Sequence, residues 1–494
     1  MTNMNKTYTK ENDSDSDDFQ LWQEAGKLIH ISLPSVMTQF NLYFIFPQSA
    51  STVGRLLGTA ELAAFSLGSL IGSLTCLSVL VGALSGLDTL LPRAYGQQEY
   101  RELGRLSLRA IVVCCALLAP ALIGLSQTDF MEFLFVQIGK QDTTVATLAA
   151  HTWIPIFLWG VPANLLFRVW QRFLVAQHQP WPPACASLVP TSLLHPFFLK
   201  VLIPLYGLSG SAYAIVLTQW STLLLLLLVM VRNPTHQPES LPALFSLAYW
   251  QESLALEPLG QFLHLSVGGV VSLSEWWFWE IMCFAAGSFG VVALCAHTIA
   301  YNLIPLSFMI VLGTQIGLSV RMGTLLAMKQ FDHAKKLATW TMGVIAGTGV
   351  MAGWVLHSLR RNIVLVFSKD PDVMAVTLAI WPKVCYYIFV LFIFGINSAI
   401  LRTLGMQWQM AVVVFTSLWC FALPLVLYLA VYRGGGLDEQ WTILPIVYTL
   451  MQVWLVFTYG TKDWKQQSAQ IQRVRTDGES GINEQSKLLA GIDC

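Results

Sequence analysis

Charged residues are scarce in this sequence. Asp, Glu, Lys and Arg make up 11% of its 494 residues, whereas about a quarter of an average soluble domain is charged. Hydrophobic residues make up 55% of the chain. The composition therefore excludes an ordinary soluble domain and predicts an integral membrane protein.

A secretory signal and a catalytic cluster are also missing. The start, "MTNMNKTYTKENDSDSDDFQ", is acidic and polar without an apolar core, which excludes a signal peptide and predicts a disordered cytoplasmic tail over residues 1–28. Most of the nine cysteines lie in apolar stretches without metal-ligand spacing. Because we find no convergent set of His, Asp and Cys, we expect no enzyme activity, no metal and no cofactor.

Long apolar runs occur twelve times along the chain. Each has about 20 residues, the length that crosses about 30 Å of hydrocarbon as a helix. They predict an all-α integral membrane fold with twelve transmembrane helices. The runs cover approximately residues 30–53, 62–85, 106–126, 146–167, 184–206, 209–231, 261–287, 291–318, 337–358, 376–399, 410–432 and 441–459.

A polar segment over residues 232–260 divides these runs into two sets of six. We therefore predict two six-helix bundles, over residues 29–231 and 261–460, joined by a cytoplasmic linker and followed by a cytoplasmic tail over residues 461–494. With both termini cytoplasmic, most of the 28 Lys and Arg residues fall in inner loops and tails. This distribution agrees with the positive-inside rule.

Segments of the two halves resemble each other at a constant offset. "AELAAFSLGS" and "VVALCAHTIA" begin 231 residues apart, and so do "GLDTLLPRAYGQQEYRELGR" and "GLSVRMGTLLAMKQFDHAKK". A third pair, "FLVAQHQ" and "TLGMQWQ", is offset by 230 residues. Because each half has an even number of spans, the two halves have the same orientation in the membrane. The sequence therefore predicts parallel repeats, related by a pseudo-two-fold axis along the membrane normal, with a transported solute between them.

Carboxylates within the apolar runs are few. Only Glu275 and Glu280 lie within a run, and Asp88 follows the end of the second run by three residues. A carboxylate near the bilayer centre costs about 2.5–3.5 kcal/mol on insertion scales, so such groups usually face an interior cavity or a partner. Glu275 is the central residue of the seventh helix if that helix spans Leu263 to Gly287. Five helical positions place Glu280 about 140° around that helix and closer to its outer end.

The stretch "LSEWWFWEIMC" surrounds Glu275 with aromatic and thioether groups. Trp279 and Met282 share its helix face and Phe278 flanks it, so we expect these side chains to line a cavity for an organic cation. Burial favours the neutral acid and a nearby cation favours the charged form. A proton and a cationic solute would then compete for Glu275, which is the minimal chemistry of an antiporter. The alternatives are a hydrogen-bond anchor for Glu275 and plain packing for the tryptophans.

Asp88 lies at the inner end of the second run, just before a basic loop. We interpret it as the N-cap of the helix that follows, or as an inner gate that pairs with Arg93 or Arg321. Both interpretations give it a structural or gating role rather than direct proton carriage.

Four segments together resemble a known family. "GRLLGTAELAAFSLGS", "GLDTLLPRAYGQQEYRELGR", "LSEWWFWE" and "AILRTLGMQWQ" occur in this order and look like signature segments of the multidrug and toxic compound extrusion (MATE) family, in its eukaryotic branch. The resemblance runs from about residue 30 to residue 460. It implies a twelve-helix antiporter that exports organic solutes against protons or, in some bacterial members, sodium.

The resemblance also implies roles for individual residues. Glu275 and Glu280 match the glutamates of the family's seventh helix and would couple transport to protons. Asp88 matches the acidic residue of the segment after the second helix, and Arg402 with Gly405 matches the "LR-x-x-G" segment. We expect Asp88 and Arg402 to act in gating or structure.

The second half departs from the family pattern. Asn302 stands where many animal members carry an acid, and we expect it to line the cavity; the tenth run has no acid at all. Either Glu275 and Glu280 then carry proton coupling nearly alone, or the solute is less cationic. His297 is the best histidine candidate for proton transfer, although an ordinary hydrogen-bonded helix histidine is the commoner interpretation.

The first half has no counterpart of the two glutamates. The offset of 231 maps them onto Phe44 and Ser49, so coupling should sit in the second half. The neutral side chains of Gln39 and Asn164 are candidate solute contacts, although interhelical hydrogen bonds are the commoner use of such groups.

Together these features predict a proton-coupled antiporter that exports organic solutes by alternating access, with protons favoured over sodium. The alternative is a lipid or glycolipid flippase of related fold. The expected partners are small organic solutes and the lipid bilayer, with no nucleic acid and a monomeric chain. An acidic dileucine sorting signal is matched by Glu484, Leu488 and Leu489. We therefore expect either the plasma membrane or a vacuolar or lysosomal membrane as the location of the protein.

Overall fold

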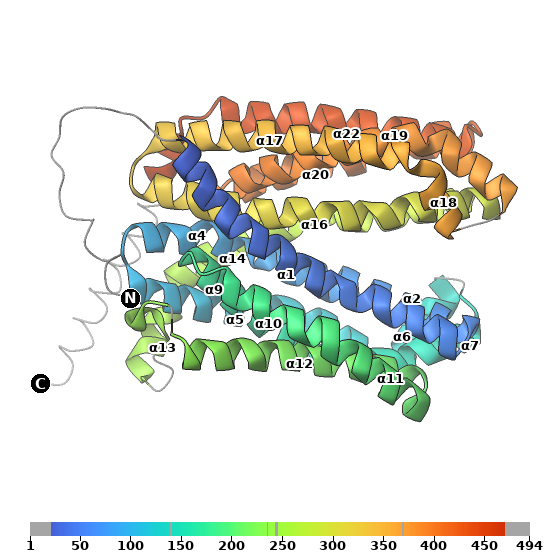
Figure 1. Cartoon of the computed structure of the whole chain (residues 1–494), viewed down its shortest axis with the longest axis horizontal. Helices are drawn as coiled ribbons and strands as arrows, with labels where there is room; N and C mark the ends of the chain where they lie inside the picture. Colours follow the sequence, from blue (N-terminus) through green and yellow to red (C-terminus); the bar gives the residue numbers. More distant parts are fainter. Residues whose placement is uncertain (1–20, 139–140, 235, 243–245, 368–369, 470–494) are drawn as a thin grey trace, which may run out of the picture.

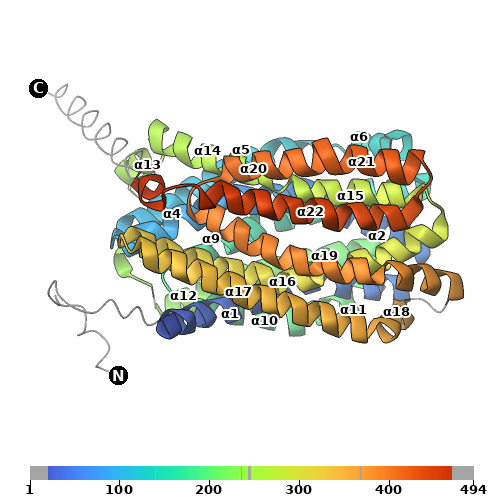
Figure 2. The ribbon, with the colours of Figure 1, turned by 90° about the horizontal axis from the view of Figure 1, so that it is seen from above.

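The fold is almost entirely helical. The computed structural model describes residues 21–138, 141–234, 236–242, 246–367 and 370–469, and no β-strand is present in these ranges. The long helices run side by side along the longest axis of the molecule (Figures 1 and 2). The all-α prediction is confirmed. The dileucine motif at Glu484 lies outside the described residues.

The N-terminal bundle, blue to green in Figure 1, contains six long segments. Three of these are single helices, α1 (Leu21–Leu56), α5 (Tyr100–Ser126) and α12 (Leu208–Arg232). The other three are composite. The second consists of α2 (Thr59–Gly72), η1 (Ser73–Leu77), α3 (Ser78–Ala83) and α4 (Ser85–Gly96). The fourth consists of α7 (Thr143–Thr147), η3 (Leu148–Trp153), α8 (Ile154–Phe157), η4 (Leu158–Gly160) and α9 (Val161–Ala176), and the fifth of α10 (Trp181–Val189), η5 (Pro190–Leu194) and α11 (His195–Tyr206).

The C-terminal bundle repeats this plan from yellow to red. Its first segment consists of α14 (Leu256–Ser272) and α15 (Ser274–Gly287), and its fifth of α20 (Gln407–Phe415), η7 (Thr416–Ala422), α21 (Leu423–Val426) and η8 (Leu427–Tyr432). The other four are the single helices α16 (Val291–Ala327), α17 (Phe331–Ser358), α19 (Pro371–Thr403) and α22 (Gly436–Gly460). Shorter connecting elements are α6 (Thr128–Phe133), η2 (Leu134–Ile138), η6 (Pro238–Ser240), α13 (Leu247–Ser253) and α18 (Arg360–Phe367).

Ten of these segments are long and apolar enough to cross a membrane by length and composition. The remaining two positions are occupied by α1 and by the interrupted pair α14 and α15. The predicted arrangement of twelve helices in two six-helix bundles is therefore confirmed. The end of the molecule that carries α13, on the left in Figure 1, is called the linker end below.

Two helix boundaries differ from the prediction. The first helix begins at Leu21, inside the stretch 1–28 predicted to be a disordered tail. The seventh run is not one helix, because α14 ends at Ser272 and α15 begins two residues later. At this break the Ser272 hydroxyl donates to the Gly269 carbonyl (2.7 Å), a local bond of the kind that competes with helix continuation. Glu275 therefore lies in the first turn of a new helix, not at the centre of a continuous one.

The two bundles meet along α4 and α16 and along two further helix pairs, α1 with α16 and α3 with α14. Glycine permits both approaches. A Cβ atom at Gly313 would lie 2.4 Å from the backbone nitrogen of Val36, and one at Gly82 would lie 2.5 Å from the Cα of Val270. Both distances are shorter than real Cβ contacts, so a larger residue would push the helices apart. These glycines are themselves 231 residues apart, which makes the two seams equivalent.

Equivalent positions of the two halves contact each other near the linker end. A Cβ atom at Gly323 would lie 2.7 Å from the Cβ of Pro92, and one at Gly96 would lie 2.8 Å from the Cβ of Ala327. Both pairs are separated by the repeat offset of 231. Because equivalent residues meet only close to a symmetry axis, a pseudo-two-fold axis passes between α4 and α16. The predicted parallel repeat is thus visible in individual contacts.

Hydrogen bonds join the bundles toward the linker end. On one seam the Thr89 hydroxyl of α4 donates to the carbonyl of Arg402 (2.6 Å), and the Gln407 amide donates to Thr89 (2.7 Å). On the other seam Arg321 of α16 donates from Nε to Oε2 of Glu24 in α1 (3.1 Å). Both seams are therefore closed by polar contacts as well as by packing.

His178 adds to the second of these contacts from the loop between α9 and α10. Its ring nitrogens lie 3.4 Å from Nη1 of Arg321. Burial, together with the positive charge of Arg321, lowers the pKa of His178 to about 4. The ring is thus neutral near pH 7 and can accept this bond, so two side chains of the N-terminal bundle hold one arginine of the C-terminal bundle.

The close approach at Gly313 makes a testable difference to stability. We expect Gly313→Val to lower the thermal unfolding midpoint of the purified protein, because overpacking of this kind costs about 1–3 kcal/mol. The matched control is Gly347→Val on α17, where an added Cβ would have nothing within 4 Å. Equal midpoints for the two variants in a thermal melt would contradict the packing of α1 against α16.

Candidate functional site

Glu275 is buried in the C-terminal bundle, with 4% of its surface exposed. Its Oε1 accepts a hydrogen bond from the hydroxyl of Tyr448 in α22 (3.0 Å). None of the ion pairs between described residues includes Glu275. Its place in the first turn of α15 favours a negative charge, whereas its apolar surroundings favour the neutral acid. The site can therefore accommodate both protonation states.

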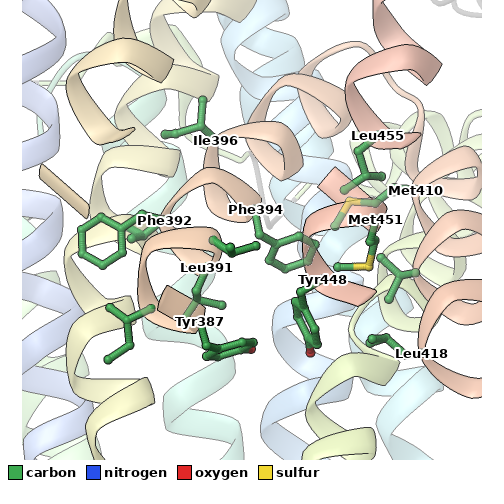
Figure 3. Packing of buried hydrophobic residues seen from close by; sticks show 14 of the residues in the cluster. Tyr387, Leu391, Phe392, Phe394, Ile396, Met410, Leu418, Tyr448, Met451 and Leu455 are labelled. Atoms are coloured by element: carbon green, nitrogen blue, oxygen red, sulfur yellow. The ribbon is translucent and has the colours of Figure 1, made fainter. Parts of the chain in front are cut away.

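Trp279 connects two tyrosines beside this carboxyl group. Its indole Nε1 donates to the hydroxyls of Tyr448 (3.0 Å) and Tyr387 (3.1 Å). The two tyrosine rings pack edge to face with centroids 4.9 Å apart. Figure 3 shows them at the same level of the core, on α19 and α22. We call these four residues, Glu275, Trp279, Tyr387 and Tyr448, the carboxyl cluster.

Phe278 and Met282 are buried with Glu275 on one side of α15, as the helical spacing indicated. Both are fully buried in a large apolar core that also contains Met410 and Met451, which appear near Tyr448 in Figure 3. In this structure the bundle encloses Phe278, Trp279 and Met282. Contact of these side chains with a solute stays a prediction.

Glu280 is only partly buried and contacts α16, where its Oε1 accepts from the Tyr301 hydroxyl (2.9 Å). The next residue, Asn302, is exposed and donates to a carbonyl one turn earlier in its own helix (2.9 Å). His297 is buried, and its Nε2 lies 3.4 Å from the Sγ of Cys283. No group of three or more His, Cys, Asp and Glu side chains in the described ranges is placed to hold a metal ion.

Sequence reasoning missed a polar chain that adjoins the carboxyl cluster. Asn397 of α19 donates to Gln452 (3.1 Å) and accepts from Tyr459 (3.0 Å), both of α22. Gln452 in turn donates to the carbonyl of Tyr448 (3.1 Å). A signal was available, because Tyr448, Gln452 and Tyr459 recur at helical spacing within the last apolar run.

Asp88 pairs with Arg172, and not with either predicted arginine. The Nε of Arg172 lies 2.9 Å from Oδ1 of Asp88, within the N-terminal bundle. Asp88 is not an N-cap either, because α4 already begins at Ser85 and its start has no side-chain cap bond. The N-cap prediction was wrong because the helix starts three residues earlier, and the predicted partners were wrong because the neighbouring helix α9 supplies the arginine. A gating role for Asp88 stays a prediction.

Arg402 lies near both acidic positions. It is buried at the end of α19 and interacts electrostatically with Asp88 of the N-terminal bundle and Glu275 of the C-terminal bundle. Neither acid forms a salt bridge with Arg402 among the described residues. Glu280, Asn302 and Asn164 bond to other partners, and Gln39 is largely buried on α1.

The two neutral candidates of the N-terminal bundle lie on α1 and α9. Asn164 accepts at Oδ1 from the Nε of Arg168, one turn later in α9 (2.6 Å). Gln39 is largely buried on α1. Contact of either side chain with a solute stays a prediction.

Comparison with known proteins places this helical arrangement in a family. The MatE profile matches residues 34–200 and 269–427, which together span most of both bundles. The chain belongs to the MatE family. The resemblance seen in the sequence motifs is thereby confirmed for this MatE chain.

Sequence relatives of this MatE protein include animal proteins. Multidrug and toxin extrusion protein 1 of Xenopus tropicalis is 25% identical over 456 residues, a match that covers 92% of this chain and 77% of the relative. Multidrug and toxin extrusion protein 2 of Homo sapiens is 26% identical over 485 residues, with 90% and 77% covered. The match thus extends through both halves.

Solved structures share the fold of this MatE protein. The eukaryotic MATE transporter AtDTX14 superposes with a TM-score of 0.81 at 20% identity, covering 92% of this chain and 99% of that one. The Vibrio cholerae MATE transporter VcmN in its bent form gives 0.76 at 15% identity, with 92% and 99% covered. The two-bundle architecture is therefore that of MATE transporters.

The buried pair of Asp88 and Arg172 predicts a specific stability pattern. We expect Asp88→Asn to destabilise the protein by about 3–5 kcal/mol, because it leaves the arginine buried and uncompensated. The double variant Asp88→Asn with Arg172→Gln should recover part of this loss in chemical or thermal unfolding. Strictly additive losses in this double-mutant cycle would show that the two side chains do not interact.

Proposed function

We propose that this MatE protein is a secondary active transporter that exports organic solutes in exchange for protons. Its relatives bear the name multidrug and toxin extrusion proteins, which supports cationic or amphipathic xenobiotics as its solutes. The bias of Lys and Arg toward one set of loops supports cytoplasmic termini. On this orientation the linker end faces the cytoplasm.

The observation that carries this proposal is the environment of Glu275. The carboxyl group is buried, and its hydrogen-bond partner, Tyr448, is neutral. Because none of the described side chains forms an ion pair with it, the carboxylate is neutralised either by a proton or by a cationic solute. Competition between these two for one carboxyl group couples their movements in opposite directions. The aromatic rings of Trp279 and Tyr387 offer additional stabilisation to a cation.

The inter-bundle contacts support alternating access as the mode of transport. Arg321 with Glu24 and Thr89 with Arg402 close the bundles toward the linker end. Glu275 lies on α15, which continues from α14 away from that end (Figure 2). Rocking of the two bundles about their common axis would break these contacts and expose the site to the other side.

The N-terminal bundle has no counterpart of the two glutamates, which supports proton coupling by the C-terminal bundle. At the positions equivalent to the two glutamates it has Phe44, which is exposed, and Ser49, which is buried. The Ser49 hydroxyl lies 3.0 Å from Nε2 of His195, whose Nδ1 lies 2.8 Å from the Thr218 hydroxyl. This network holds no acid, so proton coupling is assigned to the C-terminal bundle.

Glu275→Gln tests the proposal directly, because it keeps the size and hydrogen bonding of the side chain while it removes titration. In reconstituted vesicles with an imposed pH gradient, we expect solute uptake by this variant to fall to the level of protein-free vesicles. The matched control is Glu257→Gln, which changes an exposed glutamate in the first turn of α14. It should transport at the unmodified rate.

Three outcomes would overturn this assignment. Full gradient-driven uptake by Glu275→Gln would remove the carboxyl group from the coupling mechanism. Uptake that follows a sodium gradient instead would replace the proton as the coupling ion. Movement of fluorescent phospholipids that is indifferent to both gradients would favour a flippase over an antiporter.

A further inference from the structure

His178 lies in a strained turn just after α9. The helix ends at Ala176, and two residues later His178 has a φ of 61°, in the left-handed region that favours glycine. Its backbone nitrogen donates to the carbonyl of Val175 (3.0 Å), so the end of the helix fixes the turn. A side chain costs free energy at such a position, which indicates that the imidazole has a role of its own.

The ring of His178 contacts both bundles. Its centroid lies 5.1 Å from that of the Tyr95 ring in α4, within the N-terminal bundle. Both of its nitrogens lie 3.4 Å from Nη1 of Arg321 in α16, and Arg321 also pairs with Glu24 of α1. The ring is therefore in contact with a charged group of the other bundle, on the seam of α1 with α16.

Neither member of this contact is repeated in the other half. At the offset of 230, His178 corresponds to Trp408, whose indole nitrogen donates to the carbonyl of His264 within the C-terminal bundle (3.0 Å). At the offset of 231, Arg321 corresponds to Leu90, which carries no charge. The contact is therefore specific to one of the two seams.

The side chains described as donors across the other seam do not titrate near neutrality. None of their types changes its charge between pH 5 and 8, whereas histidine does. They are Thr89, Arg93, Ser266, Trp277 and Gln407. A change of pH in this range can therefore act on His178 without acting on these bonds.

Charged and titratable groups face His178 from three helices. They are Arg321 of α16, Tyr95 of α4, and Glu24, Lys27 and His30 of α1. Burial, and after it the charge of Arg321, lowers the pKa of His178 to about 4, and Glu24 opposes this effect. The ring is thus neutral near pH 7 while the contact is closed.

Separation of the bundles at this end removes both causes, because the ring gains water and loses Arg321. The pKa of His178 then returns toward the ordinary value of a histidine, about 6.5. A proton therefore binds more tightly when the linker end is open. The closed contact keeps its full advantage above pH 6.5 and loses it progressively as the pH falls from about 6.5 to about 4.

We propose that His178 is a pH-sensitive latch, whose protonation breaks the contact with Arg321 and favours the arrangement in which the linker end is open. On the orientation given above this end faces the cytoplasm, the side that proton entry acidifies. The latch would thus respond to the proton load that transport itself creates. This proposal goes beyond the proposed function, because it uses the rocking of the bundles but not the titration of Glu275.

The test measures the distance between the bundles at the linker end, by double electron–electron resonance on the purified full-length protein. Spin labels are attached to a ketone-bearing amino acid at Arg101 of α5 and Asp332 of α17, which are both exposed, so the nine cysteines stay unlabelled. All proteins also carry Glu275→Gln, which removes the titration of Glu275. Between pH 7.5 and pH 6 we expect the ratio of open to closed protein to rise about fourfold, from pKa values of about 4 and about 6.5.

Two substitutions of His178 give different expectations. His178→Gln keeps a neutral polar side chain and should make the ratio the same at both pH values. His178→Lys places a permanent positive charge against Arg321 and should shift the ratio toward the open state at both. The matched control is His264→Gln, which changes an exposed histidine on α14 and should keep the fourfold rise.

The possible results separate this proposal from the proposed function. An unchanged ratio in the protein with Glu275→Gln alone would overturn the latch, as would a fourfold rise that persists in His178→Gln. A His178→Lys protein as closed as its parent at pH 7.5 would overturn it too, so the test does not depend on one variant. Full gradient-driven uptake by Glu275→Gln in vesicles would reject the coupling role of Glu275 and leave the result for His178 standing.

Discussion

The close approach of helix backbones at two glycine seams is the constraint on which this structure depends. At Gly82 and Gly313 a side chain of any size would separate α3 from α14 and α1 from α16. Only at this short distance can Arg321 reach Glu24, and Thr89 reach the end of α19. In lipid, helices gain little from the hydrophobic effect on associating, so van der Waals contact and a few hydrogen bonds hold the bundles together.

The helices of the two bundles are arranged symmetrically, but their buried polar side chains differ. The N-terminal bundle contains the ion pair of Asp88 with Arg172 and the network of Ser49, His195 and Thr218. The C-terminal bundle instead buries Glu275 and Arg402, and no other described residue forms an ion pair with either. A stable protein can leave such groups uncompensated where a ligand or a proton completes them. The repeat therefore departs from its own symmetry at these two charged side chains.

The sequence predicted those features that depend on periodicity. The twelve apolar runs correspond to the helices, and the offset of 231 is correct to the residue at Pro92 and Gly323. The helical spacing also placed Phe278, Trp279 and Met282 on one buried face.

Features that depend on which helices become neighbours were not accessible from the sequence. The partner of Asp88 and the tyrosines around Glu275 come from helices remote in sequence. The break after Ser272 depends on a local hydroxyl bond that apolar composition conceals. Packing across the bundle thus decides the chemistry of the site.

The contacts on the pseudo-two-fold axis also bear on the evolution of the chain. In each pair one member is glycine and the other is larger, with Pro92 against Gly323 and Ala327 against Gly96. Two identical copies of the first half would place proline against proline on that axis, where there is no room for both. The two halves have therefore become complementary rather than merely similar. At these positions a glycine in one half makes room for the larger residue of the other half.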